Sequence, residues 1–130
     1  MNLKITITTI ITLILTSCYN QECRCDLVKT GHFKSEITVD DQLLSTDILR
    51  TEDYQFETFN NKTDTFSIRW INDCEFILKN ANQSSKSYSK SYHYKILSTQ
   101  SDSCYTYLFK EQIRHQKIQT FKAKAKRLNP

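Results

Sequence analysis

Apolar and polar residues alternate along much of this chain, and that alternation limits its fold more than any other feature. In "FKSEITV", residues 33–39, Phe33, Ile37 and Val39 fall on one face, opposite lysine, glutamate and threonine. Alternation with a period of two is typical of a β-strand with one buried and one solvated face. Further strand candidates lie at 43–50, 53–59, 64–70, 74–78, 92–97 and 104–109, with a weaker final strand at 117–123.

The connections between these segments suit hairpins. Asn72-Asp73 predicts a tight turn before residues 74–78, and Ser101–Ser103 predicts another before residues 104–109. Residues 80–91 are polar and serine-rich, which indicates a long loop or a short surface helix. With no amphipathic helical pattern, the sequence predicts an all-β fold, either a small antiparallel up-and-down β-barrel of seven or eight strands or a curved sandwich.

Glycine and proline are almost absent, with Gly31 and Pro130 as the single examples of each. Glycine-rich phosphate-binding loops and the glycine-flanked nucleophile turn of hydrolases both need more than one glycine. The common nucleotide-binding and hydrolase signatures are therefore excluded. Asparagine, aspartate and serine must supply the turns.

The first seventeen residues have the pattern of a secretory signal peptide. Lys4 precedes an apolar segment, residues 5–15, that is too short to cross a hydrocarbon core of roughly 30 Å. The segment ends in "LTSC", which resembles the bacterial lipobox and implies cleavage before Cys18 and acylation of its thiol. Tyr19 stands where an aspartate would retain some lipoproteins at the inner membrane, which favours the outer membrane, in either leaflet. An ordinary secretory signal or a buried helix is the alternative.

Cleavage there would leave 113 of the 130 residues, enough for one domain. The net charge is +4, or +3 without Lys4, which does not indicate a nucleic-acid partner. The basic end is expected to be a frayed, solvated terminus; contact with anionic lipid headgroups or phosphates is the alternative. We expect a signal peptide at 1–17, a lipidated N-terminus and tether at 18–30, a β domain at 31–122 and a basic tail at 123–130.

Several segments together resemble a known family. They are "KTGHF" at 29–33, "ILRTEDYQFE" at 48–57, "IRWINDCEFIL" at 68–78, and "YHYKILST" followed by "YTYLF" between 92 and 109. In these segments the chain resembles a family of small lipoproteins from flavobacteria and other Bacteroidota. The resemblance implies a lipocalin-like barrel and no established reaction. Some related chains are labelled DNA topoisomerase IV, but DNA strand passage needs a nucleophilic tyrosine, a carboxylate-bound metal and large domains that a 113-residue exported domain cannot supply.

If Cys18 carries lipid, four cysteines remain, and an even number in an exported domain indicates disulfides. A bond between Cys23 and Cys25 is disfavoured because one intervening residue closes a strained ring. Since Cys25 and Cys74 flank the segments that carry the resemblance, we expect them to pair, and Cys23 to pair with Cys104. The exchanged pairing is the alternative. A zinc site is disfavoured by the C-x-C spacing and by oxidation of exported thiols, so no metal or cofactor is expected.

Other polar groups are expected to be structural. His32, His93 and His115 lie far apart with no neighbour that marks a catalytic base, and the acidic pairs at 40–41 and 52–53 are typical of turns. The candidate ligand contacts are Trp70, Arg69 and Arg50. Trp70 is expected to anchor the core, and a platform on which a ligand stacks is the alternative. Arg50 is expected to close the open end of a barrel by stacking or by pairing with a carboxylate, where it could also bind an anion.

Together these features predict a non-enzymatic lipoprotein domain, tethered to the outer membrane through lipid on Cys18, that binds an envelope component or a small apolar ligand. The competing hypothesis is a structural or inhibitor-like envelope module with a filled core. An enzyme is the third, although no polar cluster points to one. The first two differ in whether the barrel interior is empty or packed, with a lining that includes Phe66, Ile68, Trp70, Phe76 and Leu78.

Overall fold

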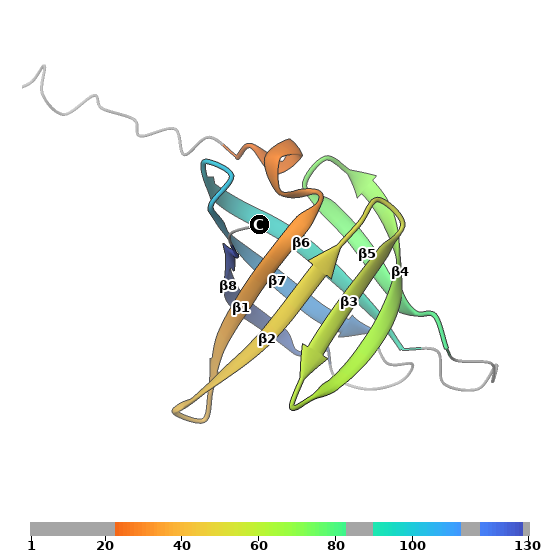
Figure 1. The fold of residues 1–130 in the computed structure, drawn as a ribbon, viewed down its shortest axis with the longest axis vertical. Coiled ribbons are helices and arrows are strands. Elements are labelled where there is room, and N and C mark those ends of the chain that lie inside the picture. The colour runs from red at the N-terminus through yellow and green to blue at the C-terminus, as the bar shows by residue number, and fades with distance from the viewer. Residues whose placement is uncertain (1–22, 83–89, 113–117, 129–130) are drawn as a thin grey trace, which may run out of the picture.

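A computed structural model describes residues 23–82, 90–112 and 118–128 of the chain. Within them a short 3-10 helix, η2 (Cys25–Val28), precedes eight strands (Figure 1). The strands are β1 (Gly31–Val39), β2 (Gln42–Arg50), β3 (Tyr54–Phe59), β4 (Lys62–Asn72), β5 (Glu75–Asn80), β6 (Ser91–Gln100), β7 (Cys104–Gln112) and β8 (Thr120–Arg127). None of the described segments is a helix long and apolar enough to span a membrane.

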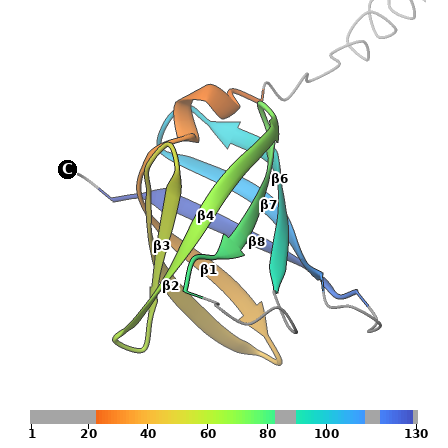
Figure 2. The same cartoon turned by 90° about the vertical axis from the view of Figure 1, so that its right-hand side faces the viewer.

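Each strand pairs antiparallel with the next, and β8 pairs back onto β1, so the described strands form a closed barrel (Figures 1 and 2). This topology confirms the predicted up-and-down barrel over the sandwich. Two hairpins turn on residue pairs with positive φ, Asp40-Asp41 after β1 and Asn60-Asn61 after β3. Aspartate and asparagine tolerate that conformation, which matches the twist of the flanking strands.

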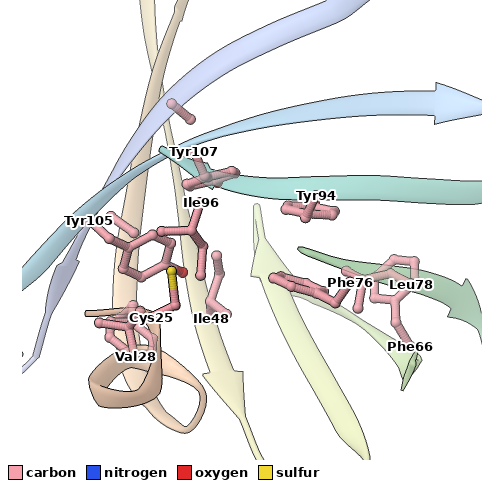
Figure 3. Packing of buried hydrophobic residues seen from close by; sticks show 13 residues of the cluster. Cys25, Val28, Ile48, Phe66, Phe76, Leu78, Tyr94, Ile96, Tyr105 and Tyr107 are labelled. Carbon is pink, nitrogen blue, oxygen red and sulfur yellow. The ribbon is translucent and has the colours of Figure 1, made fainter. Parts of the chain in front are cut away.

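Alternation places the apolar side chains inside the barrel. On β4, Phe66 is buried, and Ile68 and Trp70 pack against the same core, as the sequence predicts. The β3 strand is the exception, because Gln55 is fully buried there while the ring of Tyr54 is 47% exposed. Figure 3 shows the resulting core, in which Tyr105 of β7 lies beside Cys25 and Val28 of η2, while Tyr94 of β6 is stacked on Phe76 of β5.

The helix η2 covers one end of the barrel, which we call the closed end (Figure 1). Cys25 and Val28 are buried there. At the opposite, open end lie the β1–β2 and β3–β4 hairpin turns. Since η2 is part of the core, the β domain begins before residue 31, where the sequence placed its start.

The basic segment at 123–130 was expected to be a tail, and the structure corrects this, because β8 continues to Arg127. In "KAKAK", Ala123 and Ala125 face the core while the lysines are exposed. Arg127 donates to the carbonyl oxygens of Leu27 and Asp102, both at 2.7 Å, and so ties β8 to the closed end. Gly31, with φ of 142°, lies against this guanidinium, where a Cβ atom would collide with Arg127 Nη1.

The serine-rich segment, residues 80–91, connects two strands, as the sequence predicts. The β5 strand ends at Asn80 and β6 begins at Ser91. Residues 83–89, which carry most of the predicted loop or surface helix, lie outside the described residues.

Candidate ligand-binding site

The closed half of the barrel is filled, and a buried arginine lies at its centre. The Arg50 side chain is 2% exposed, and it donates from Nε to Gln55 Oε1 at 2.6 Å. It also donates from Nη1 to the Val28 carbonyl oxygen at 2.9 Å and from Nη2 to the Tyr105 hydroxyl at 2.8 Å. Three rings surround its Cζ atom at 4.8–5.6 Å from their centroids: Phe33, Phe76 and Tyr105.

Arg50 therefore closes the barrel by stacking, at the end that η2 covers rather than at the open end. Its partners are a carbonyl, an amide oxygen and a hydroxyl in place of the expected carboxylate. Each of its three nitrogens is engaged and the group is buried, so its role is structural, and an anionic ligand has no access to it.

The Arg50 guanidinium is linked to a half-buried carboxylate through one intermediate. Gln55 Nε2 donates to Glu57 Oε1 at 2.6 Å, which links the guanidinium through an amide to a carboxylate. The Tyr94 hydroxyl donates to the same oxygen at 3.3 Å. Burial raises the pKa of Glu57, since a charged carboxylate loses hydration inside the barrel. The chain Arg50–Gln55–Glu57–Tyr94 thus runs from the filled half toward the open half.

The open half of the barrel holds a cavity of about 230 Å³, the open-end cavity. Five aromatic rings and two carboxylates contribute to its wall. Its lining consists of Ser35, Ile37, Thr46, Ile48, Glu57, Asp64, Phe66, Tyr92, Tyr94, Tyr107, Phe109 and Ala123. The interior is thus packed at the closed end and hollow at the open end. The sequence analysis considered an empty interior and a packed interior, and each of these describes one half of the barrel.

Stacked aromatic rings form the boundary between the two halves. The ring of Tyr94 is stacked on Phe76, Tyr107 and Phe109 at centroid distances of 5.0, 5.4 and 5.5 Å. Figure 3 shows Tyr94 with the first two of these partners. The Tyr107 hydroxyl shares a hydrogen bond of 2.5 Å with the Ser35 hydroxyl. Burial raises the pKa of both tyrosines, so both keep their protons at neutral pH. The cavity wall is therefore aromatic and carries neutral hydroxyl groups.

The residues proposed from sequence as ligand contacts lie elsewhere. Trp70 is half-buried near the closed end, packed on Phe76 at 4.6 Å with the Lys29 ammonium 5.0 Å from its ring centroid. Arg69 is exposed. Arg50 belongs to the filled half, so none of the three lines the open-end cavity.

Sequence reasoning missed the two carboxylates of the cavity, Glu57 and Asp64. The signal lay in "YQFETF", where one face of the predicted strand carries only Gln55, Glu57 and Phe59, two of them polar. Burial of that polar face is unfavourable unless each group has a partner, and those partners come from β2 and β6.

The cysteines confirm one predicted bond and correct the other. Cys25 and Cys74 form a disulfide that joins η2 to β4 and β5. The expected Cys23–Cys104 bond is absent, and both are free thiols. Cys23 lies beside the disulfide, with its Sγ 2.9 Å from Cys25 Sγ and 3.7 Å from Cys74 Sγ, whereas buried Cys104 donates to Gln100 Oε1 at 2.8 Å. The exchanged pairing is not formed either.

Three of the four cysteines considered for zinc therefore come together. Sγ atoms of Cys23, Cys25 and Cys74 lie within 4.8 Å of one another. Because two of these sulfurs are joined covalently, Cys23 alone offers a thiolate to a metal in this state.

The two histidines in the described part of the chain, His32 and His93, form no common site. His93 Nε2 lies 3.0 Å from Glu75 Oε2, and the same carboxylate lies 3.6 Å from the Lys95 ammonium. His32 is exposed, and His115 lies outside the described residues.

A shallow groove of about 420 Å³ runs along the seam where β1 and β8 separate. The two strands are paired only over Phe33–Glu36 and Lys124–Arg127. Its rim carries exposed charges from Glu36, Lys122 and Lys124, so water already solvates this groove.

Comparisons with protein-family models, with curated proteins and with solved structures give no match. Function is therefore inferred from the residues of the barrel themselves.

Proposed function

We propose that this chain is a lipid-anchored protein of the bacterial envelope whose β-barrel binds one small molecule in the open-end cavity. The observation that carries the proposal is the cavity of about 230 Å³ lined by five aromatic rings, inside a barrel whose closed half holds the buried Arg50 and its aromatic neighbours. Binding without catalysis fits this site, because no serine or threonine among the described lining residues is hydrogen-bonded to a carboxylate or a histidine.

The construction of the barrel supports this proposal. The disulfide, Arg50 and Arg127 hold the closed end, so the open half can stay hollow without loss of the fold. Apolar ligand surface buried against such a wall contributes roughly 25 cal/mol per Å². A barrel that served only as a structural module would gain stability by filling this space, since cavities lose packing contacts.

The proposed anchor determines how the barrel would face the membrane. Cys18 of the lipobox-like "LTSC" would carry the lipid, and only residues 19–24 separate it from η2. At most about 3.6 Å per residue, six residues span roughly 20 Å. The chain enters the barrel at the closed end, so that end would face the bilayer and the cavity would open away from it (Figure 1).

The binding function is tested by NMR titration with 2-phenylethylamine and 2-phenylethanol, which share one small aromatic body. We expect at least one probe to shift resonances of Tyr94, Tyr107 and Phe66 saturably. Ala123→Phe should abolish the shifts, because Ala123 faces the cavity, whereas Lys124→Phe on the exposed face should retain them. If neither probe shifts these resonances, or if Ala123→Phe leaves the titration unchanged, the proposed function is wrong.

A further inference from the structure

The open-end cavity carries negative charge on two adjacent strands. Glu57 on β3 and Asp64 on β4 are direct cross-strand partners, and both line the cavity. Like charges in this arrangement repel each other across the pair. Among the described residues that line the cavity there is no lysine, arginine or histidine to neutralise them.

The nearest cations leave that charge available. Lys62 Nζ lies 3.8 Å from Asp64 Oδ1, but its side chain is 80% exposed at the rim, so the ion pair is weak and solvated. Arg50 is hydrogen-bonded to Glu57 only through Gln55, and its positive charge favours the ionised form of that carboxylate. A ligand that enters the cavity therefore meets two carboxylates and no competing cation within the wall.

Glu57 is held in place for such a ligand. Hydrogen bonds from Gln55 Nε2 and the Tyr94 hydroxyl both reach Oε1, and no other described residue donates to Glu57. Oε2 therefore remains free to accept a hydrogen bond. Because Arg50 and the stacked rings fix the two donors, little side-chain entropy would be lost when a ligand binds.

The aromatic wall favours the same class of ligand. Tyr92, Tyr94 and Phe66 line the same cavity as the two carboxylates, and aromatic faces attract organic cations within about 6 Å of a ring centroid. Apolar surface on the ligand would pack on these rings while an ammonium group meets the carboxylates. A bare divalent metal fits less well, since Ca²⁺ takes 6–8 oxygen ligands and the only metal-sized cluster in the described chain consists of cysteines.

We infer that the open-end cavity selects a small organic cation, an amine with a compact apolar body, through Glu57 and Asp64. This inference rests on the proposed binding function and specifies the ligand class of the same site.

The test compares three probes that share one body and differ in charge: 2-phenylethylamine, 2-phenylethanol and phenylacetate. Affinities are measured by NMR titration at pH 8 and low ionic strength, where the amine is protonated. We expect the amine to bind at least tenfold more tightly than the alcohol, and phenylacetate to bind more weakly than the alcohol. A parallel titration with CaCl₂ is expected to leave the cavity resonances unchanged.

Substitutions assign the selectivity to the two carboxylates. Glu57→Gln and Asp64→Asn should each weaken amine binding threefold or more and leave alcohol binding within twofold. Glu36→Gln removes an exposed carboxylate on the outer seam and should leave all affinities unchanged. Asp64 is only partly buried, so Asp64→Asn keeps the test valid if Glu57→Gln does not fold.

The outcomes separate the two claims. If the alcohol binds as tightly as the amine, the cation inference is wrong and the binding function stands. Competition by CaCl₂, or loss of amine binding in Glu36→Gln, would also overturn the cation inference. If no probe shifts the cavity resonances, both claims fail.

Discussion

Arg50 Nη1 donates a hydrogen bond of 2.9 Å to the carbonyl oxygen of Val28, and this contact joins β2 to the helix that closes the barrel. The same guanidinium stacks among Phe33, Phe76 and Tyr105. A desolvated cation with three fixed partners thus lies at the point where helix and strands meet. Arg50 therefore contributes to the stability of the closed end together with the Cys25–Cys74 disulfide and Arg127.

Arg50→Lys should therefore lower the free energy of unfolding by about 3 kcal/mol. A lysine ammonium cannot reproduce the planar stack or reach three separate acceptors, and buried groups left unpaired cost about 1–3 kcal/mol each. Urea denaturation followed by circular dichroism measures the change. Arg69→Lys, the same substitution at an exposed position, should change stability by less than about 0.5 kcal/mol. Equal effects at both positions would contradict the structural role of Arg50.

Removal of the Cys25–Cys74 disulfide should cost about 2–4 kcal/mol, because it closes a loop between residues 49 apart in sequence. The Cys25→Ala/Cys74→Ala double variant, compared with the wild type by urea denaturation, measures this cost. Reductant should destabilise the wild type because it breaks the Cys25–Cys74 bond. Cys104→Ala, which removes a free thiol, should not cause this loss of stability. If reductant leaves the free energy of unfolding of the wild-type protein unchanged, the Cys25–Cys74 disulfide is absent.

The remaining thiols should differ in reactivity. Exposed Cys23 should react with iodoacetamide in the folded protein, and buried Cys104 should react only after unfolding. Since burial raises the pKa of the Cys23 thiol, its alkylation should be slow at neutral pH and accelerate as the pH increases. Peptide mapping by mass spectrometry identifies the modified residues. A Cys23–Cys104 disulfide in the map would contradict this assignment.

Glu57→Gln should stabilise the protein, with a gain that depends on pH. Burial, opposed by hydrogen bonds and by Arg50 and reinforced by Asp64, raises the pKa of Glu57 above its ordinary 4.5. The folded state therefore holds this proton more tightly than the unfolded state, and wild-type stability decreases as pH increases through the raised pKa.

The glutamine variant retains acceptors for Gln55 and Tyr94 but carries no charge. Its advantage should be near zero below pH 4.5 and reach up to about 1 kcal/mol at pH 8, the size of a relieved cross-strand repulsion. Thermal denaturation at several pH values measures the difference, with Glu36→Gln as the exposed control. A gain that is constant with pH would contradict the assignment to Glu57.

Metabolic labelling with palmitate tests the anchor. We expect the mature protein to begin at Cys18, to carry label and to fractionate with the outer membrane. Cys18→Ser should abolish the label and release the chain from the membrane, whereas Cys23→Ser should do neither. An unprocessed chain with residues 1–17 intact would refute the lipoprotein proposal.

The alternation of residues was enough to predict most of the barrel, because on β1 and β4 the polarity of each side chain indicates whether it faces the core or the solvent. The prediction failed where the residue composition of a strand obscured the alternation of buried and exposed positions. Ala123 and Ala125 alternate with lysines on β8, but the charge of this segment suggested a tail. The β3 strand buries Gln55 and exposes Tyr54, because the buried amide oxygen of Gln55 accepts a hydrogen bond from Arg50 on the neighbouring strand.

The candidate site was less accessible from sequence. Its two carboxylates come from neighbouring strands, and the register that sets Glu57 opposite Asp64 depends on the Asn60-Asn61 turn. Likewise, the sequence predicted the Cys25–Cys74 bond but paired Cys23 with Cys104, whereas the fold places Cys23 beside that bond. Residue spacing along a chain does not determine distances across a barrel.

The most direct test of the account is where a bound amine lies. Intermolecular nuclear Overhauser effects between 2-phenylethylamine and the isotope-labelled protein measure this position. If the amine occupies the open-end cavity, the probe contacts the rings of Tyr94 and Phe66 and makes no contact with Trp70 near the closed end. Contacts confined to Trp70, or to exposed rings such as Tyr54 and Phe59, would contradict this placement.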